Sequence, residues 1–244
     1  MRQLLSKCSV LCVQEHWLSD SQLLLLGHLN QNFSCAGVSG FGNNEILSGR
    51  PYGGCAVLWR NDIHARVQVL DVCSKRISAI RLCNNSFSLL LISVYMLTDG
   101  DESKTDDYTD QLAIMDSLNE ANTDCHVITA GDFNVDLSRQ RIYTAMLQSF
   151  CSDNGVSPVA LHQSAKFDYS YHFGMTRFSL IDHFLVSGTL FSNAISGAYV
   201  LHEVDNTSDH DSIVLQLDLK VEFVKFVNKV HTPRSSWEKP RMGT

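Results

Sequence analysis

The pattern of apolar and polar positions along the chain predicts a succession of short strands, separated by turns and a few helices. Apolar runs of about four to eight residues, flanked by Gly, Asn, Ser or Pro, are typical of strands in a folded core. Such runs occupy residues 8–14, 52–59, 65–70, 76–82, 87–95, 125–130, 180–187, 197–204 and 212–219. Asn84-Asn85 is a turn signal between two of these runs, which predicts an antiparallel hairpin.

Other segments have the spacing of helices. In residues 106–121 the apolar positions recur at helical intervals, at Tyr108, Leu112, Met115 and Leu118. A second helix is predicted to begin with Ser138 as its N-cap and to end at Asn154-Gly155. Its inward-facing residues are expected to be Ile142, Ala145, Met146 and Phe150. We also expect a short helix that begins at Ser19-Asp20-Ser21 and a loop rich in Gly and Asn over residues 37–49.

Because strands outnumber helices and include a hairpin, the pattern predicts a mixed-sheet α/β domain rather than a purely parallel array. The chain has 244 residues, 44% of them hydrophobic, which is enough to form a sizeable core in one domain. We expect this domain to span residues 1–219, with two domains as the less favoured alternative. The basic segment 220–244 is interpreted as a linker or tail in solvent, although its Lys and Arg residues would also suit phosphate contacts.

Charge and cysteine usage limit the classes of function. The net charge of −7 argues against a protein that holds nucleic acid by bulk electrostatics, but metal ions in a site would offset local negative charge, so a nuclease is not excluded. The eight cysteines form no Cys-x-x-Cys pair and lie mostly in apolar runs. This usage is typical of reduced thiols in an intracellular protein, nuclear or cytoplasmic, rather than a secreted one. No apolar run approaches the roughly 20 residues of a membrane span, so no membrane partner is expected.

Polar residues suited to metal and proton chemistry gather at the ends of the predicted strands. They are Glu15, Asp132, Asn134, Asp182, Asp209 and His210. Carboxylates at strand ends can converge on a hard cation such as Mg²⁺ or Mn²⁺. A single strand-end Asp is usually a helix cap or a turn former, but a whole series of such residues is harder to explain in that way. The set suits water attack on a phosphodiester, with one carboxylate activating the water and a His–Asp pair binding phosphate or moving a proton.

These residues lie in four short motifs whose order resembles that of the endonuclease/exonuclease/phosphatase superfamily. The motifs are Gln14-Glu15, Gly131-Asp132-Phe133-Asn134, Ile181-Asp182-His183 and Ser208-Asp209-His210. Further segments resemble the endonuclease domains of non-LTR (LINE-type) retrotransposons: Glu15-His16-Trp17-Leu18, Arg50-Pro51-Tyr52-Gly53-Gly54, Asn134-Val135-Asp136-Leu137 and Tyr171-His172. The resemblance covers residues 8–217. Each motif alone is weak, whereas four in order at plausible separations are specific.

The resemblance implies an α/β fold of four layers, a sandwich of two mixed sheets flanked by helices. The superfamily begins with a strand that ends in Asn, and Met1 falls after that point in the comparison. We therefore expect the first strand of the family, with its Asn, to be missing. A second departure is Leu97, at a position where the family usually has Pro.

The resemblance also assigns roles at the metal and the phosphate. Glu15 resembles the glutamate that binds the catalytic metal, Mg²⁺ or Mn²⁺, and Asp209 resembles a carboxylate near a second metal position. Tyr95 resembles the tyrosine that contacts the scissile phosphate, with a core aromatic as the alternative reading. Asn134 is expected to hydrogen-bond a phosphate oxygen.

The remaining roles concern proton transfer. The resemblance implies that Asp132 positions or deprotonates the attacking water and that His210 stabilises the transition state. Asp182 is then expected to fix the tautomer of His210. Whether His210 or Asp132 is the base stays open, as do readings of Asp182 as a turn former and of Asp209-His210 as an ordinary loop.

The function implied by the resemblance is that of a metal-dependent endonuclease that nicks DNA, an activity that loss of the first strand and its Asn would impair. The resemblance also implies a fused reverse transcriptase in the parent element and a monomeric state. One alternative is a catalytically inactive remnant of a retrotransposon. Another is a phosphatase or phospholipid phosphodiesterase of the same fold, which a basic or apolar substrate loop would favour. The loop 37–49 is neither basic nor apolar.

Overall fold

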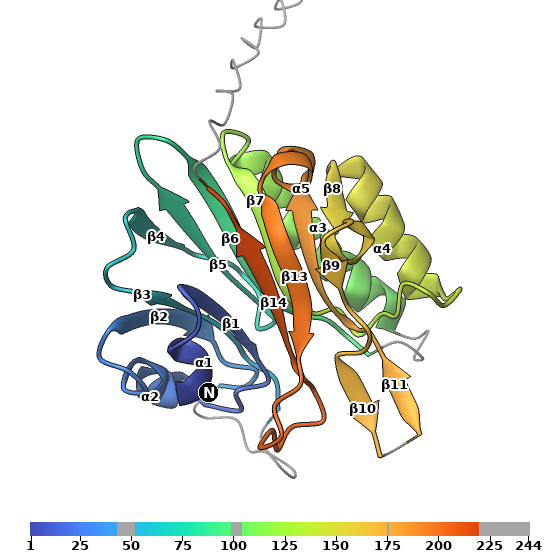
Figure 1. The fold of residues 1–244 in the computed structure, drawn as a ribbon, viewed down its shortest axis with the longest axis horizontal. Coiled ribbons are helices and arrows are strands. Elements are labelled where there is room, and N and C mark those ends of the chain that lie inside the picture. The colour runs from blue at the N-terminus through green and yellow to red at the C-terminus, as the bar shows by residue number, and fades with distance from the viewer. Residues whose placement is uncertain (43–51, 99–103, 175, 220–244) are drawn as a thin grey trace, which may run out of the picture.

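A six-stranded mixed sheet forms the centre of the fold (Figure 1). The computed structural model describes residues 1–42, 52–98, 104–174 and 176–219. Across the sheet the strands are β4 (Arg66–Leu70), β5 (Ile77–Cys83), β6 (Ser88–Tyr95), β7 (His126–Asp132), β12 (Asp182–Ser187) and β8 (Val156–Pro158). β6 and β7 run parallel, whereas every other neighbouring pair is antiparallel. The mixed sheet predicted from the sequence is confirmed.

Two three-stranded sheets cover one face of this central sheet. One has the order β1 (Val10–Gln14), β3 (Cys55–Arg60) and β2 (Phe33–Val38). The other has the order β14 (Ser212–Leu217), β13 (Ile195–Leu201) and β9 (Ala165–Lys166). Both contribute to a shared apolar core with the central sheet, through residues such as Val57 and Ala198. Among the described residues β1 and β14 are edge strands, so the second layer of the sandwich is divided in two.

The helices complete a four-layer arrangement. α3 (Thr105–Ala121) and α4 (Ile142–Asp153) cover the other face of the central sheet, where the Tyr108 and Tyr143 rings stack 4.2 Å apart. The short α1 (Arg2–Leu5) and α2 (Leu24–Gly27) pack against the β1–β3–β2 sheet, and α5 (Gly188–Asn193) follows β12. No helix among the described residues is long and apolar enough to cross a membrane.

Strand periodicity explains why β6 can support two cores. Leu90, Ile92 and Val94 point toward the helices, and the alternate residues Leu89 and Leu91 point toward the small sheets. Side chains alternate between the faces of a strand, so a strand that is buried on both faces has an unbroken apolar sequence. The long apolar run predicted as a strand is thereby placed in the middle of the molecule.

The start of α4 differs from the prediction. Ser138 is not the N-cap: its hydroxyl donates a hydrogen bond of 2.6 Å to Asp136, and the helix begins at Ile142 after Arg141. Ile142 is 46% exposed and Ala145 is exposed as well, so the predicted inward face is shifted. The buried face carries Tyr143, Thr144, Leu147, Phe150 and Cys151. Ser138 instead lies in a turn in which its backbone amide and its hydroxyl both donate to Asp136. The end at Asn154-Gly155 is confirmed, with Gly155 at a φ of 61°.

Several short elements were not predicted. Strand β2 overlaps the first two residues of the predicted loop 37–49. Residues 43–49 of that loop lie outside the described residues. The predicted helix after Ser19 is a 3₁₀ turn, Asp20–Gln22, followed by the single-turn α2. The ribbon of β10 (Tyr171–Phe173) and β11 (Arg177–Ser179) and strands β8 and β9 are too short to show a periodic pattern. The tail 220–244 lies outside the described residues.

Candidate active site

Three adjacent strands bring their site residues to the same edge of the central sheet. Asp132 is the last residue of β7, and Asp182 is the first residue of β12 directly opposite it in the antiparallel register. Tyr95 ends β6 and lies beside Asp132 in the parallel register. Asp132 is 5% exposed and Asp182 is 8% exposed, so both carboxyl groups are buried. The sheet register therefore assembles what the sequence separates by 37 to 87 positions.

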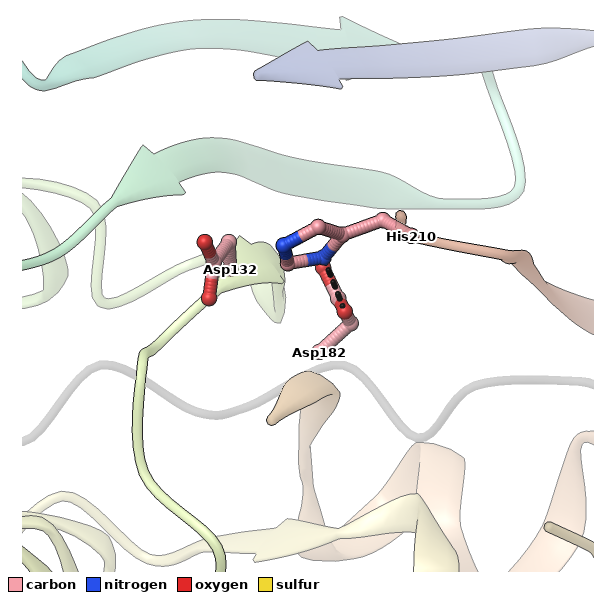
Figure 2. A group of neighbouring side chains, drawn as sticks. All are labelled: Asp132, Asp182 and His210. Atoms are coloured by element: carbon pink, nitrogen blue, oxygen red, sulfur yellow. Dashed lines mark hydrogen bonds and ion pairs between the residues drawn. The ribbon is translucent and has the colours of Figure 1, made fainter. Parts of the chain in front are cut away.

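His210 completes this group from the loop between β13 and β14. Its Nδ1 lies 2.9 Å from an Asp182 carboxylate oxygen. Potential ligand atoms of Asp132, Asp182 and His210 all lie within 4.8 Å of one another. Figure 2 shows the His210 ring between the two carboxyl groups, with its second nitrogen on the side of Asp132. The Tyr171 ring packs against His210 at a centroid distance of 5.0 Å.

The electrostatics of the site favour the protonated forms of Asp132 and His210. Burial, together with the charge of Asp182, raises the pKa of Asp132 to about 8, and His210 and a hydrogen bond from the Asn134 amide oppose this rise. Burial alone would lower the pKa of His210, but the Asp182 hydrogen bond and the neighbouring carboxylates raise it to about 9. The cause is a pair of buried carboxyl groups that share one imidazole as their neighbouring cation.

Asn134 fixes the orientation of Asp132. Its backbone amide donates to one Asp132 oxygen at 2.8 Å, and its side-chain amide donates to the other at 3.1 Å. The same side-chain nitrogen donates to the Met96 carbonyl at 3.0 Å. Asn134 has a φ of 53°, in the left-handed region that Asn tolerates better than most residues. Gly131 precedes Asp132 at a φ of 147°, where an added Cβ would lie 2.0 Å from the Val94 carbonyl oxygen.

Glu15 and Tyr95 form a second contact at this edge. The Tyr95 hydroxyl donates a short hydrogen bond to the Glu15 carboxylate, and burial together with this bond raises the pKa of Tyr95. Glu15 has a φ of 50°, and its backbone amide donates to the Gly54 carbonyl at 2.9 Å. The negative charge of Glu15 contributes to the raised pKa of Asp132. Glu15 itself does not belong to the group formed by Asp132, Asp182 and His210.

Asp209 lies at the margin of the site. It is exposed, its backbone carbonyl accepts a hydrogen bond from the His172 amide at 2.9 Å, and its charge contributes to the raised pKa of His210. Like Glu15, it does not belong to the group formed by Asp132, Asp182 and His210. The structure thus gathers the other predicted residues at one edge of the central sheet and places Asp209 beside them.

Ser170 has no role in the interpretation of the sequence, yet the structure places it at the base of the site. Ser170 is fully buried, and its hydroxyl accepts a hydrogen bond of 3.1 Å from the Asp182 amide. Its carbonyl accepts one of 2.6 Å from the Asp211 amide. A lone Ser in a loop has no periodic or motif signal, so pattern reading could not find it. Asp211 adjoins the Ser208-Asp209-His210 motif, and this adjacency was the only signal for it.

The donor set fits a hard divalent cation. Two carboxyl groups buried in register repel each other when both are ionised, and this repulsion adds to burial in raising the pKa of Asp132. A cation among carboxylate oxygens relieves such repulsion. All eight cysteines are free thiols, and no thiol belongs to the three-residue group. The site therefore has the oxygen-rich chemistry expected for Mg²⁺ or Mn²⁺ rather than a thiolate site.

Comparison with known proteins identifies the family to which the chain belongs. The chain belongs to the Endonuclease/Exonuclease/phosphatase family, whose model matches residues 1–210. Members of this family are typically hydrolytic nucleases or phosphatases. A search of curated protein sequences gives no match.

Solved structures share the fold at low sequence identity. The endonuclease domain of TRAS1, a telomere-specific non-LTR retrotransposon, is 15% identical, with a TM-score of 0.67 over 90% of this chain and 89% of that one. The 3′ phosphatase NExo from Neisseria, bound to a product DNA hairpin, is 16% identical, with a TM-score of 0.65 over 89% and 92%. A mannosyl-6-phosphatase from Bacteroides thetaiotaomicron is 18% identical, with a TM-score of 0.59 over 89% and 88%.

Proposed function

We propose that this protein is a Mg²⁺- or Mn²⁺-dependent phosphodiester hydrolase that nicks DNA, of the type found in non-LTR retrotransposons. The observation that carries the proposal is the in-register pair of Asp132 and Asp182 with His210 bonded to Asp182. Such a group offers a carboxyl for the attacking water and a cationic imidazole for the phosphate. The quoted motifs and the fold shared with the TRAS1 endonuclease domain support the narrower assignment.

The residues divide the chemistry among them. Asp132, oriented by Asn134, positions the attacking water and accepts its proton when ionised. His210, held by Asp182, donates a hydrogen bond to a phosphate oxygen and offsets the charge that develops there. Asn134 and Tyr95 are proposed to contact the phosphate from the same edge as donors. To do so they would exchange the hydrogen bonds that the Asn134 side-chain amide donates to Met96 and Asp132 and that the Tyr95 hydroxyl donates to Glu15.

Glu15, whose charge acts on Asp132, and Asp209, whose charge acts on His210, are proposed to hold the metal. When bound, the cation would supply Lewis-acid stabilisation of the phosphate and of the leaving oxygen. Tyr95 fixes the Glu15 carboxylate through its hydroxyl, which reduces the ordering required when a cation binds. Asp209 is exposed and remains accessible for a second cation.

The proposed partner is DNA, bound by a monomeric chain whose parent element also encodes a reverse transcriptase. Because the net charge is −7, binding should depend on the site, its cation and local basic residues rather than on the whole surface. An intracellular location accords with a DNA substrate and with free thiols.

A phosphomonoesterase is the second candidate, because two of the similar structures are named as phosphatases. The group of Asp132, Asp182 and His210 could support hydrolysis of either a phosphodiester or a phosphomonoester. The third possibility, an inactive remnant, predicts the same fold without turnover.

One assay separates the three. The purified chain is incubated with supercoiled plasmid, with a 3′-phosphorylated DNA oligonucleotide, and with sugar and inositol phosphates, in Mg²⁺ or Mn²⁺ and again in EDTA. We expect plasmid nicking that EDTA and His210→Ala abolish and that Asp116→Asn, on the exposed side of α3, preserves. Phosphate release without nicking would assign the phosphatase activity, and no turnover of any substrate would assign the remnant.

A further inference from the structure

The loop that carries His210 contains few buried side chains of its own. It runs from the end of β13 at Leu201 to the start of β14 at Ser212, and residues 204–209 are all exposed. A loop of this kind has little apolar burial to fix its conformation. Catalysis nevertheless requires the His210 ring to keep a defined position over Asp182 and Asp132.

A bridge of two carboxylates and one imidazole connects the two ends of this loop to each other and to Asp168. His202 Nδ1 is 2.6 Å from an Asp211 carboxylate oxygen, and His202 Nε2 is 3.1 Å from both carboxylate oxygens of Asp168. The ring also packs on Tyr169 at a centroid distance of 4.6 Å. Two carboxylates can both accept hydrogen bonds only when both ring nitrogens carry protons, so the arrangement suits the imidazolium form.

Asp211 links this bridge to the peptide group between His210 and Asp211. Its side chain is only 8% exposed, and its second oxygen accepts a hydrogen bond of 2.8 Å from the Asn206 side chain. The same Asn206 nitrogen donates to the His210 carbonyl at 2.7 Å. The Asp211 amide donates to the Ser170 carbonyl at 2.6 Å.

The bridge also reaches the partner of His210. Ser170 follows Asp168 by two positions, and its hydroxyl accepts a hydrogen bond from the Asp182 amide. Tyr171, the next residue, pairs with His210 in an isolated β-bridge. The segment 168–171 therefore contacts the His202 bridge, the His210 loop and the Asp182 strand end.

We infer that His202 is a positioning residue of the active site, whose bridge between Asp168 and Asp211 holds the His210 loop in register with Asp182. This inference rests on the proposed function for its catalytic consequence, but not for its structural one. His202 touches neither the group of three nor the residues assigned to the cation. The hydrogen bond between His202 and Asp211 raises the pKa of the His202 ring.

The structural consequence is tested by hydrogen–deuterium exchange of the full chain without metal. His202→Ala should increase exchange in peptides covering 168–172 and 203–211, where the Asp211 and His172 amides lose their fixed acceptors. Peptides from β5, β6 and β7 should be unchanged. The matched control is His28→Ala, an exposed histidine at the end of α2. Unchanged exchange in the His210 loop would overturn the inference.

The catalytic consequence is tested by nicking kinetics. Because misplacement of a catalytic group by about 1 Å can cost up to about 100-fold in rate, we expect His202→Ala to lower kcat roughly 10-fold or more while KM stays within about 2-fold. The double variant His202→Ala/His210→Ala should be as slow as His210→Ala alone. A loss confined to KM, or independent multiplication of the two losses, would contradict the positioning role.

A milder variant covers the case in which His202→Ala fails to fold. Asp168→Asn keeps the ring and its Asp211 contact but removes the carboxylate, 60% exposed, at the far end of the bridge. It should increase exchange in the same two segments, by less than His202→Ala. If the native chain nicks no DNA, the proposed function fails, while the exchange experiment still decides the role of His202.

Discussion

Asp132 and Asp182 occupy directly opposed positions at the ends of antiparallel strands β7 and β12, so two buried carboxyl groups share one edge of the central sheet. Neither is paired with Lys or Arg among the described residues, and their nearest cationic partner is His210. This relationship explains why the pKa of Asp132 rises and why a cation is expected to bind nearby. It also leads to the first prediction.

Asp132→Asn should abolish most activity without destabilising the fold. The change keeps the size of the side chain but removes the charge that activates water, so we expect nicking to fall on the order of 10²–10⁴-fold. The free energy of unfolding at pH 8 in EDTA should stay equal or rise, because an ionised carboxyl is no longer buried beside Asp182. Plasmid nicking and chemical denaturation measure the two effects. A variant that retained its nicking rate would remove Asp132 from the mechanism.

Asp182 and His210 should behave as one functional unit. Asp182→Asn leaves the His210 ring in place but removes the carboxylate bonded to Nδ1, and His210→Ala removes the ring itself. Each change should slow nicking on the order of 10²–10⁴-fold. The double variant should be about as slow as His210→Ala alone, because Asp182 acts through His210. Losses that multiply would show that Asp182 acts separately, for instance on the cation.

Glu15 and Tyr95 should govern the dependence on metal. Glu15→Gln is expected to raise the Mg²⁺ concentration needed for half-maximal nicking and to be partly rescued by high Mn²⁺. Tyr95→Phe, which removes the hydroxyl bonded to Glu15, should produce a smaller change in the same direction. Metal titrations of the nicking rate measure both. As a comparison, Asp116→Asn on α3 should leave the titration curve unchanged.

Stability without metal should depend on pH through Asp132. Its folded pKa is raised from 3.8 to about 8, so its favourable contribution is fully present below pH 4 and is lost as the pH rises to about 8. The variant Asp132→Asn has no titrating group at this position. The stability of that variant relative to the native chain should therefore increase between pH 4 and about 8, and then level off. Urea denaturation in EDTA across this range gives the comparison, and a constant difference would mean that the carboxyl group is not destabilised by its surroundings.

The backbone around Glu15 should depend on the absence of a side chain at Gly54. Gly54 has a φ of 94°, and an added Cβ would lie 2.3 Å from the His16 ring. Gly54→Ala should therefore destabilise the protein and weaken metal-dependent nicking. Gly155→Ala is the matched control, because Gly155 also has a positive φ, 61°, but open space around it. We expect about 1 kcal/mol from the positive φ in the control and a larger loss at Gly54. Thermal unfolding and nicking assays check the contrast, and equal losses would show that His16 moves aside.

The sequence by itself determined most of the segments that form the core and named the candidate site residues. An unbroken apolar run such as the one ending at Tyr95 indicates a strand that is buried on both faces. Runs of this kind form the central strands of the structure. Glu15, Asp132, Asp182 and His210 were found because each adjoins such a strand within a recognisable motif. Local composition and order are sufficient for conclusions of this kind.

Only the tertiary structure decided how those residues meet. The pairing of Asp182 with Asp132 depends on strand register, and a shift by one residue would turn the side chains to opposite faces. The start of α4 at Ile142 rather than after Ser138 is seen only in the structure, and the position of Ser170 depends on its hydrogen bonds to Asp182 and Asp211. The His202 bridge joins His202 to Asp168, 34 positions away, through side-chain hydrogen bonds. Such contacts follow from the packing of the sheets and have no local pattern, because their energies arise only after the chain has folded.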